Sequence, residues 1–148
     1  MLIVMTAVAL APAHARALEA GCDRSEVREL IDKFVAAYNR GDVAYLDQVW
    51  AQGPDFFWYF VQDDVLRRGS LAKDRSTLPV YFAERTAYDE ELTLRRLAIK
   101  WERGWHGAWD IAFELTRRSD HLEASGRYLG KAAATCQHLH AWAMGRDS

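Results

Sequence analysis

Two consecutive amphipathic segments between Asp23 and Trp50 limit the folds that are open to this chain of 148 residues. In the first segment, apolar residues recur at helical spacing and form one stripe, made of Val27, Leu30, Ile31, Phe34, Val35 and Tyr38. Asp23 or Ser25 can cap its start, and Gly41 is a typical helix stop. Asp42 then caps a shorter second helix. Because neither helix can bury its stripe alone, the strands that follow must supply the opposing surface.

The spacing of apolar residues changes from helical to alternating after Glu91. Leu92 and Leu94 share one parity whereas Leu97 and Ile99 share the other, so the phase slips by one residue at positions 95–96. A slip inside one long strand is typical of a β-bulge, and bulges bend sheets. Further strands are predicted at 56–62, 65–68, 109–115, 127–135 and 139–144, and a third helix after Ser76. This order predicts an α+β fold in which N-terminal helices cap a cone-shaped, curved antiparallel sheet.

The first 17 residues have the pattern of a cleavable leader. The apolar run from Met1 to Ala11 is too short for an ordinary transmembrane helix, and the Ala15-x-Ala17 pattern suits signal-peptidase cleavage. We therefore expect a signal peptide at 1–17 and a single domain at 18–148, in a secreted or periplasmic protein whose mature form does not insert into a membrane. A buried N-terminal helix is the alternative, since the usual positive charge before the apolar run is missing.

Cys22 and Cys136 are the two cysteines of the chain. An even number of cysteines in an oxidising compartment favours a disulfide, and one that closes so long a loop would stabilise the fold by roughly 4 kcal/mol. It would join the start of the first helix to the last hairpin. The alternative is a pair of buried thiols that behave as small apolar residues.

The charged residues favour neither a nucleic acid nor a metal ion as partner. The net charge is −2, and the arginine doublets at 67–68, 95–96 and 117–118 are interpreted as solvated strand ends or local ion pairs rather than a basic stripe. Asp110 and Glu114 share a strand face and are expected to be exposed. His138 and His140 could lie on one side of a strand, but a third ligand would have to come from a turn at His106 or His121, so no metal site is predicted.

The helix pattern Ile31-x-x-Phe34-Val35-x-x-Tyr38-Asn39-x-Gly41-Asp42, followed by Leu46 and Trp50, resembles the opening of the nuclear transport factor two-like (SnoaL-like) superfamily. The later tract 130–136 with Trp142-Ala143-Met144 is similar to a secreted bacterial branch of it. The resemblance covers roughly residues 24 to 144. It implies a cystatin-like α+β roll, in which a cone of curved sheet encloses an apolar pocket beneath the helices.

The same resemblance bears on catalysis, because the superfamily includes isomerases, cyclases and dehydratases beside pure binding and assembly modules. Its ketosteroid isomerases place a base near the end of the first strand, and the matching position here is at or near Phe60, which cannot accept a proton. Asp55, Tyr38 and Tyr59 are the weak candidates that remain for acid–base chemistry. No cofactor is expected.

Small residues at Gly130, Ala132 and Ala134 lie on one face of a predicted strand. Opposite bulky side chains they could leave an open cavity, and the alternative is that aromatic rings close the gap. The candidate lining of this cavity is Tyr38, Trp58, Phe60, Phe82, Phe113 and Tyr128. A pocket of this composition would take a hydrophobic or aromatic small molecule.

Three functions are therefore compatible with the sequence. The first is an exported domain that binds a small molecule in an apolar aromatic pocket, without a catalytic set. The second is an isomerase, cyclase or hydratase acting on a nonpolar ring compound. The third is an assembly module with a filled core that forms a homodimer through the exposed face of the sheet.

Overall fold

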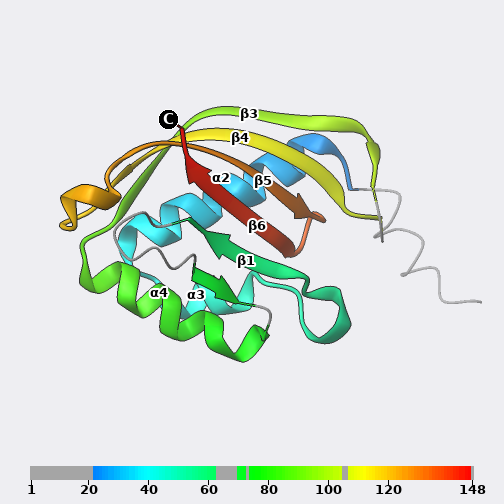
Figure 1. The fold of residues 1–148 in the computed structure, drawn as a ribbon. Helices are drawn as coiled ribbons and strands as arrows, with labels where there is room; N and C mark the ends of the chain where they lie inside the picture. Colours follow the sequence, from blue (N-terminus) through cyan, green and yellow to red (C-terminus); the bar gives the residue numbers. More distant parts are fainter. Residues whose placement is uncertain (1–21, 63–69, 73, 105–106, 148) are drawn as a thin grey trace, which may run out of the picture.

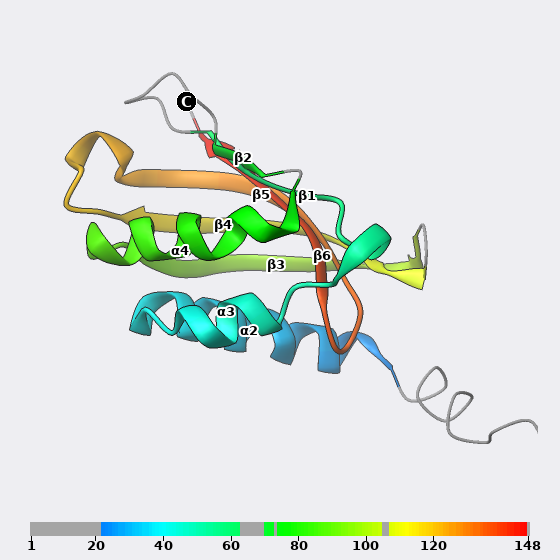
Figure 2. The same cartoon turned by 90° about the horizontal axis from the view of Figure 1, so that it is seen from below.

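A computed structural model of the protein describes residues 22–62, 70–72, 74–104 and 107–147. In this part of the chain, three helices pack on one face of a single curved sheet (Figures 1 and 2). The helices are α2 (Arg24–Arg40), α3 (Val43–Gln48) and α4 (Leu78–Ala87). The strands are β1 (Trp58–Val61), β2 (Ser70–Ala72), β3 (Glu91–Arg103), β4 (Trp109–Arg118), β5 (Gly126–Ala134) and β6 (Leu139–Arg146). The predicted α+β class is confirmed.

The order of strands across the sheet is β2-β1-β6-β5-β4-β3. The neighbours are antiparallel except for β1 and β6, which run parallel, with Tyr59 opposite Trp142. The last strand therefore lies in the middle of the sheet and joins the β1–β2 pair to the β3–β5 meander. In Figure 1, β3, β4 and β5 arch over α2, so the sheet has a concave face towards the helices and a convex outer face.

The start and end of α2 follow the local chemistry that the sequence predicts. The Asp23 carboxylate accepts hydrogen bonds from the backbone N–H groups of Ser25 and Glu26, and the Glu26 side chain accepts one from the Asp23 N–H, which completes a capping box. Gly41 ends the helix with φ of 69°, and a Cβ there would lie 2.6 Å from Cγ2 of Thr86. Glycine is thus required at this position by conformation and by space.

The long edge strand β3 carries the predicted bulge, seen as a register shift between Leu94 and Arg96. Side chains from α2 form hydrogen bonds with backbone groups along part of the outer edge of β3. The Asn39 amide donates to the Leu92 carbonyl at 2.8 Å and accepts from the Leu92 N–H at 2.7 Å, and Arg28 donates to the Leu97 carbonyl at 3.1 Å. Covering an edge in this way keeps other strands from adding to it. It also fixes α2 across the concave face.

The predicted disulfide is present, with the two sulfur atoms of Cys22 and Cys136 2.01 Å apart. It links the residue before the cap of α2 to the turn between β5 and β6, across 114 positions of sequence. The guanidinium of Arg103 donates a hydrogen bond of 2.9 Å to the Cys22 carbonyl. One end of the sheet is therefore tied to the start of the helix that it covers.

Several predicted segments shift or lie outside the described residues. The leader at 1–17 and the strand expected at 65–68 lie outside them. The strand expected at 56–62 is shorter, because a 3₁₀ turn occupies Gly53–Asp55 and β1 begins at Trp58. Among the helices of the described chain, none combines the length and apolarity needed to cross a membrane.

Candidate functional site

Aromatic rings gather on the concave face, between the sheet and the helices. Phe34 of α2 has its ring centroid 5.0 Å from that of Trp142, 6.2 Å from that of Trp50 and 6.3 Å from that of Phe82. The Phe82 ring in turn lies 5.4 Å from the ring of Tyr59. All five side chains are buried. Apolar ring contacts of this kind are typical of a well-packed core.

The space above Gly130 is taken up by the ring of Phe113. A Cβ built on Gly130 would lie 2.1 Å from Cζ of Phe113 and 2.5 Å from the carbonyl oxygen of Ala143. The Phe113 ring also stacks on Trp142, with centroids 4.1 Å apart and planes inclined by 24°. The small residue therefore makes room for a ring rather than for a cavity, which was the alternative that the sequence left open.

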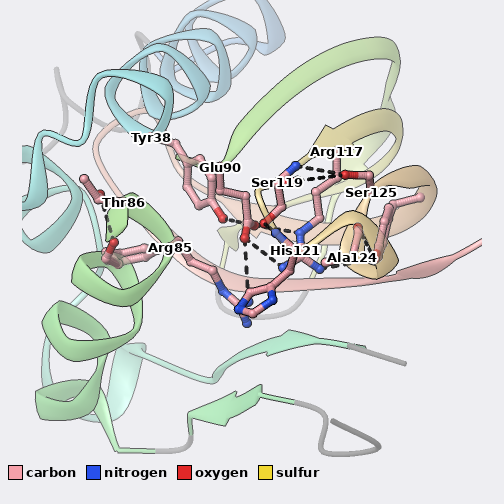
Figure 3. Close-up of polar contacts among 11 residues, drawn as sticks. Tyr38, Arg85, Thr86, Glu90, Arg117, Ser119, His121, Ala124 and Ser125 are labelled. Carbon is pink, nitrogen blue, oxygen red and sulfur yellow. Dashed lines mark hydrogen bonds and ion pairs between the residues drawn. The ribbon is translucent and has the colours of Figure 1, made fainter. Parts of the chain in front are cut away.

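A cluster of ionisable side chains is buried beside these rings, where α2, β3 and β4 meet (Figure 3). The Glu90 carboxylate, 1% exposed, accepts hydrogen bonds from Nε of Arg117 at 2.6 Å, from Nη2 of Arg117 at 2.9 Å and from the Tyr38 hydroxyl at 2.6 Å. The Arg117 side chain is fully buried and also donates to the Tyr128 hydroxyl at 3.2 Å. The Tyr128 hydroxyl donates a hydrogen bond of 2.8 Å to the Ala124 carbonyl.

Arg85 of α4 extends this cluster towards β1. Its Nη1 lies 3.7 Å from Oε2 of Glu90, and its side chain is 6% exposed. Its charge acts on Tyr59, whose buried hydroxyl has no hydrogen-bond partner of standard geometry among the described residues. We refer to Tyr38, Tyr59, Arg85, Glu90 and Arg117 as the polar cluster.

Burial and charge set the protonation of the polar cluster. Burial raises the pKa of the Tyr38 hydroxyl well above its usual value, and nearby Tyr59 and Glu90 raise it further. Burial likewise raises the pKa of Tyr59, although the charge of Arg85 opposes the shift. Burial alone would lower the pKa of Arg117, but its hydrogen bonds to Glu90 outweigh that effect and the pKa is raised. At neutral pH the cluster therefore offers tyrosine O–H groups and guanidinium N–H groups as donors.

The six residues expected to line a pocket lie on two faces of the sheet. Tyr38, Phe82, Phe113 and Tyr128 are buried on the concave side. Trp58 and Phe60 alternate with buried Tyr59 along β1, so they lie on the outer face, and Trp58 is 43% exposed. These six side chains therefore do not surround one cavity, because neighbouring positions on a strand point to opposite sides.

The other candidates are also placed by the structure. Tyr38 and Tyr59 come together in the polar cluster, whereas Asp55 is exposed in the turn before β1. Asp110 and Glu114 lie on the outer face, but both are half-buried rather than exposed as expected, with Lys100 3.3 Å from Asp110 and Arg127 2.9 Å from Glu114. His140 is buried with Nδ1 2.6 Å from the Asp55 carbonyl, and His138 lies in the turn before β6. Of the three other histidines, His121 is exposed against the Tyr88 ring, and His14 and His106 lie outside the described residues.

Sequence reasoning missed Glu90 and Arg85, and it interpreted Arg117 as one of a pair of solvated or locally paired arginines. The alternation of β4 could have predicted the burial of Arg117, because this residue continues the buried series Ile111, Phe113, Leu115. Glu90 gave no such signal, since it precedes the alternating segment and is buried against Tyr38 and Arg117, which come from distant elements.

Two neighbouring hollows of about 350 and 360 Å³ lie on the outer face of the sheet, and a wider one of about 610 Å³ lies along β3 and β4 at Arg96, Ala98 and Glu114. The first two adjoin each other at Asp110, Lys131 and Ala132. The hollow of about 360 Å³ is floored by alanines of β5 and β6 and walled by Phe57 and Trp58. Leu129 also lies on this face, 46% exposed. The outer face therefore combines apolar side chains with a rim of both charges.

The arrangement of sheet and helices matches solved structures at low sequence identity. A protein of unknown function with a cystatin-like fold from Methylobium petroleophilum superposes with a TM-score of 0.66 at 12% identity, over 85% of this chain and 78% of that one. An NTF2-like protein of unknown function from Cytophaga hutchinsonii gives a TM-score of 0.58 at 8% identity, over 81% and 88%. This chain has the nuclear transport factor two-like fold.

Solved proteins with the nuclear transport factor two-like fold include one from Bacillus subtilis that is named as a candidate isomerase, with a TM-score of 0.58 at 9% identity, over 82% of this chain and 86% of that one. No protein-family model and no curated protein sequence matches this chain. At such identities the likeness shows the fold alone. The function has to be argued from the side chains.

Proposed function

We propose that this chain is an exported domain that binds a small, largely apolar molecule on the concave side of its sheet, with the polar end of the ligand at the polar cluster. The observation that carries the proposal is the burial of five ionisable side chains beside an aromatic core. Burying ionisable groups costs desolvation free energy, which a core of apolar residues at the same positions would avoid. Buried ionisable groups are found preferentially at functional sites. The ligand would part the packed rings to reach the buried Tyr59 hydroxyl, which lies near the charge of Arg85 and has no hydrogen-bond partner of standard geometry among the described residues.

The proposed activity is binding without a chemical step. A proton-transfer reaction needs a base within hydrogen-bond reach of its substrate. Asp55, one of the three candidates for acid–base chemistry and the one carboxylate among them, is exposed in the turn before β1, outside the buried cluster. Glu90 is held by Arg117 and Tyr38, so its carboxylate serves as an acceptor for them.

The test uses 8-anilinonaphthalene-1-sulfonate, an apolar ring system with one polar group, as the probe. We expect the protein to bind one molecule of the probe, and Tyr59→Phe to weaken binding by about three- to tenfold, the worth of one hydrogen bond. Trp58→Phe is the matched control, because the adjacent side chain points to the other face and should leave binding unchanged. Equal affinities of the Tyr59→Phe variant and the wild type would exclude the polar cluster as the site.

A second function, homodimeric assembly, is supported by the outer face of the sheet. Trp58 and Leu129 are large apolar side chains that remain exposed there, beside an alanine-floored hollow. In a two-fold dimer each patch meets its own copy, so Asp110 of one subunit could face Lys131 of the other. Sedimentation should then show a dimer that the Trp58→Lys substitution dissociates. The control Val80→Lys changes an exposed side chain of α4, away from this face, and should leave the dimer intact. A monomeric wild type would refute this second function.

A further inference from the structure

The disulfide lies beside the carboxylate of Glu26, which also completes the capping box of α2. Oε2 of Glu26 is 3.5 Å from Sγ of Cys136. The sulfur atoms of Cys22 and Cys136 and the Glu26 carboxylate oxygen all lie within 4.8 Å of one another. Glu26 is exposed and the two cysteines are half-buried, so solvent reaches the group.

We propose that Cys22, Cys136 and Glu26 form a binding site for a zinc ion when the disulfide is reduced. Two thiolates and one carboxylate are ligands that zinc accepts, with a water molecule as the fourth. Zinc–sulfur bonds of about 2.3 Å and zinc–oxygen bonds of about 2.0 Å in a tetrahedron place sulfur and oxygen about 3.5 Å apart. Sγ of Cys136 and Oε2 of Glu26 are already 3.5 Å apart, whereas the two sulfur atoms, which are 2.01 Å apart in the disulfide, would have to separate to about 3.8 Å.

The position of the site in the fold also suits the charge of the complex. A zinc ion with two thiolates and one carboxylate carries a net charge of −1. The site precedes the N-terminus of the 17-residue helix α2, whose partial positive charge stabilises anions. The guanidinium of Arg103, which is bonded to the Cys22 carbonyl, adds a positive charge nearby. Oε2 of Glu26, the oxygen 3.5 Å from Cys136, also accepts the Asp23 N–H at 2.9 Å, and because a carboxylate oxygen has two lone pairs it can keep this hydrogen bond while it binds a metal.

The disulfide and the metal are alternative ways of closing the same end of the fold. In the test, tris(2-carboxyethyl)phosphine breaks the sulfur–sulfur bond. The phosphine takes the oxygen of one water molecule and becomes its oxide, and the two protons of that water end on the two sulfurs. Zinc then replaces both thiol protons, which pass to solvent.

The experiment titrates the reduced full chain with cobalt(II), a spectroscopic substitute for zinc, and then displaces the cobalt with zinc. We expect one cobalt per chain, with thiolate charge-transfer and tetrahedral ligand-field absorption that zinc abolishes. Glu26→Gln should weaken binding at least tenfold, the scale of losing a group that supports a metal. Glu29→Gln, one helical turn away on the same helix, is the matched control and should bind as the wild type does.

Other outcomes decide against the site. Cobalt binding by the reduced wild type that is no tighter than binding by the Cys22→Ser, Cys136→Ser variant would overturn it, and so would equal affinity in the Glu26→Gln variant. If reduction unfolds the chain, zinc should restore the far-ultraviolet circular dichroism of the oxidised protein, since metal binding then supplies folding free energy. A reduced chain that zinc leaves unfolded would also refute the proposal.

Discussion

Replacing Glu90 by glutamine tests the polar cluster most directly. In the wild type the Glu90 carboxylate accepts three hydrogen bonds, two from Arg117 and one from Tyr38, and lies 3.7 Å from Arg85. Glutamine is of nearly the same size but carries no charge. Its NH₂ group, a donor, would replace a carboxylate oxygen that accepts a hydrogen bond from Arg117 in the wild type. The Arg117 guanidinium, with a side chain 0% exposed, would then stay buried without its anion.

The expected cost follows from the burial of the pair. Removing one partner of a buried ion pair typically costs about 3–5 kcal/mol, a large part of the total stability of a domain. For a chain of this length, that cost lowers the melting temperature by roughly 6–20 °C. Urea unfolding, followed by circular dichroism at constant slope, gives the free energy of unfolding directly.

The neighbouring acid supplies the control. Glu91 pairs with Arg118 at 2.5 Å, but both side chains are about half exposed, so Glu91→Gln should cost at most about 1 kcal/mol. The double variant Glu90→Leu, Arg117→Met should lose less than the sum of its single variants, because it removes the Arg117 charge together with that of its carboxylate partner. A Glu90→Gln protein within 1 kcal/mol of the wild type would refute the reasoning.

Three further predictions concern packing, alkaline pH and the sheet edge. Gly130→Ala should destabilise the fold by about 1–3 kcal/mol, since its methyl group meets a ring and a backbone carbonyl; an unchanged urea midpoint would show that the strand can yield. Because the pKa values of Tyr38 and Tyr59 are raised in the folded state, these two hydroxyls should stabilise the fold fully below about pH 10, and the stabilisation should be lost as the pH rises through their pKa values in the folded protein. The measurement is an alkaline titration followed by tyrosinate absorbance, and ionisation of all six tyrosines before unfolding would contradict this prediction. Asn39→Ala should cost about 1–3 kcal/mol through two lost hydrogen bonds to β3, measured by urea unfolding against an Arg40→Ala control, and equal midpoints would exclude that role.

The fold was predictable from the sequence because its signals are local and agree with one another. The apolar stripe of α2, the cap at Asp23 and the stop at Gly41 depend on neighbouring residues, and all three are confirmed. The bulge in β3 was predictable for the same reason, because a slip of one residue reverses the face of every following side chain. The parallel pairing of β1 with β6 depends on contacts across some eighty residues, and no local pattern indicates it.

The candidate site was less predictable, because it depends on which face each strand turns inwards. The aromatic residues of β1 form an almost continuous apolar run, so their alternation could not be assigned, and Trp58 and Phe60 lie outside although both were expected inside. Glu90 and Arg117 are buried as a pair, and each alone has the composition of a surface residue. Their burial is stable because the two side chains, 27 positions apart in sequence, form an ion pair with hydrogen bonds.

The central place of β6 has a consequence for how the molecule is assembled. A ribosome releases residues 139–146 after every other strand, yet both halves of the sheet are held together through them. The pair of β1 and β2 has no further partner strand among the described residues until β6 is made, and contacts so distant in sequence form slowly. A stop codon ahead of position 139 would therefore leave the β1–β2 pair and the β3–β5 meander without the strand that joins them.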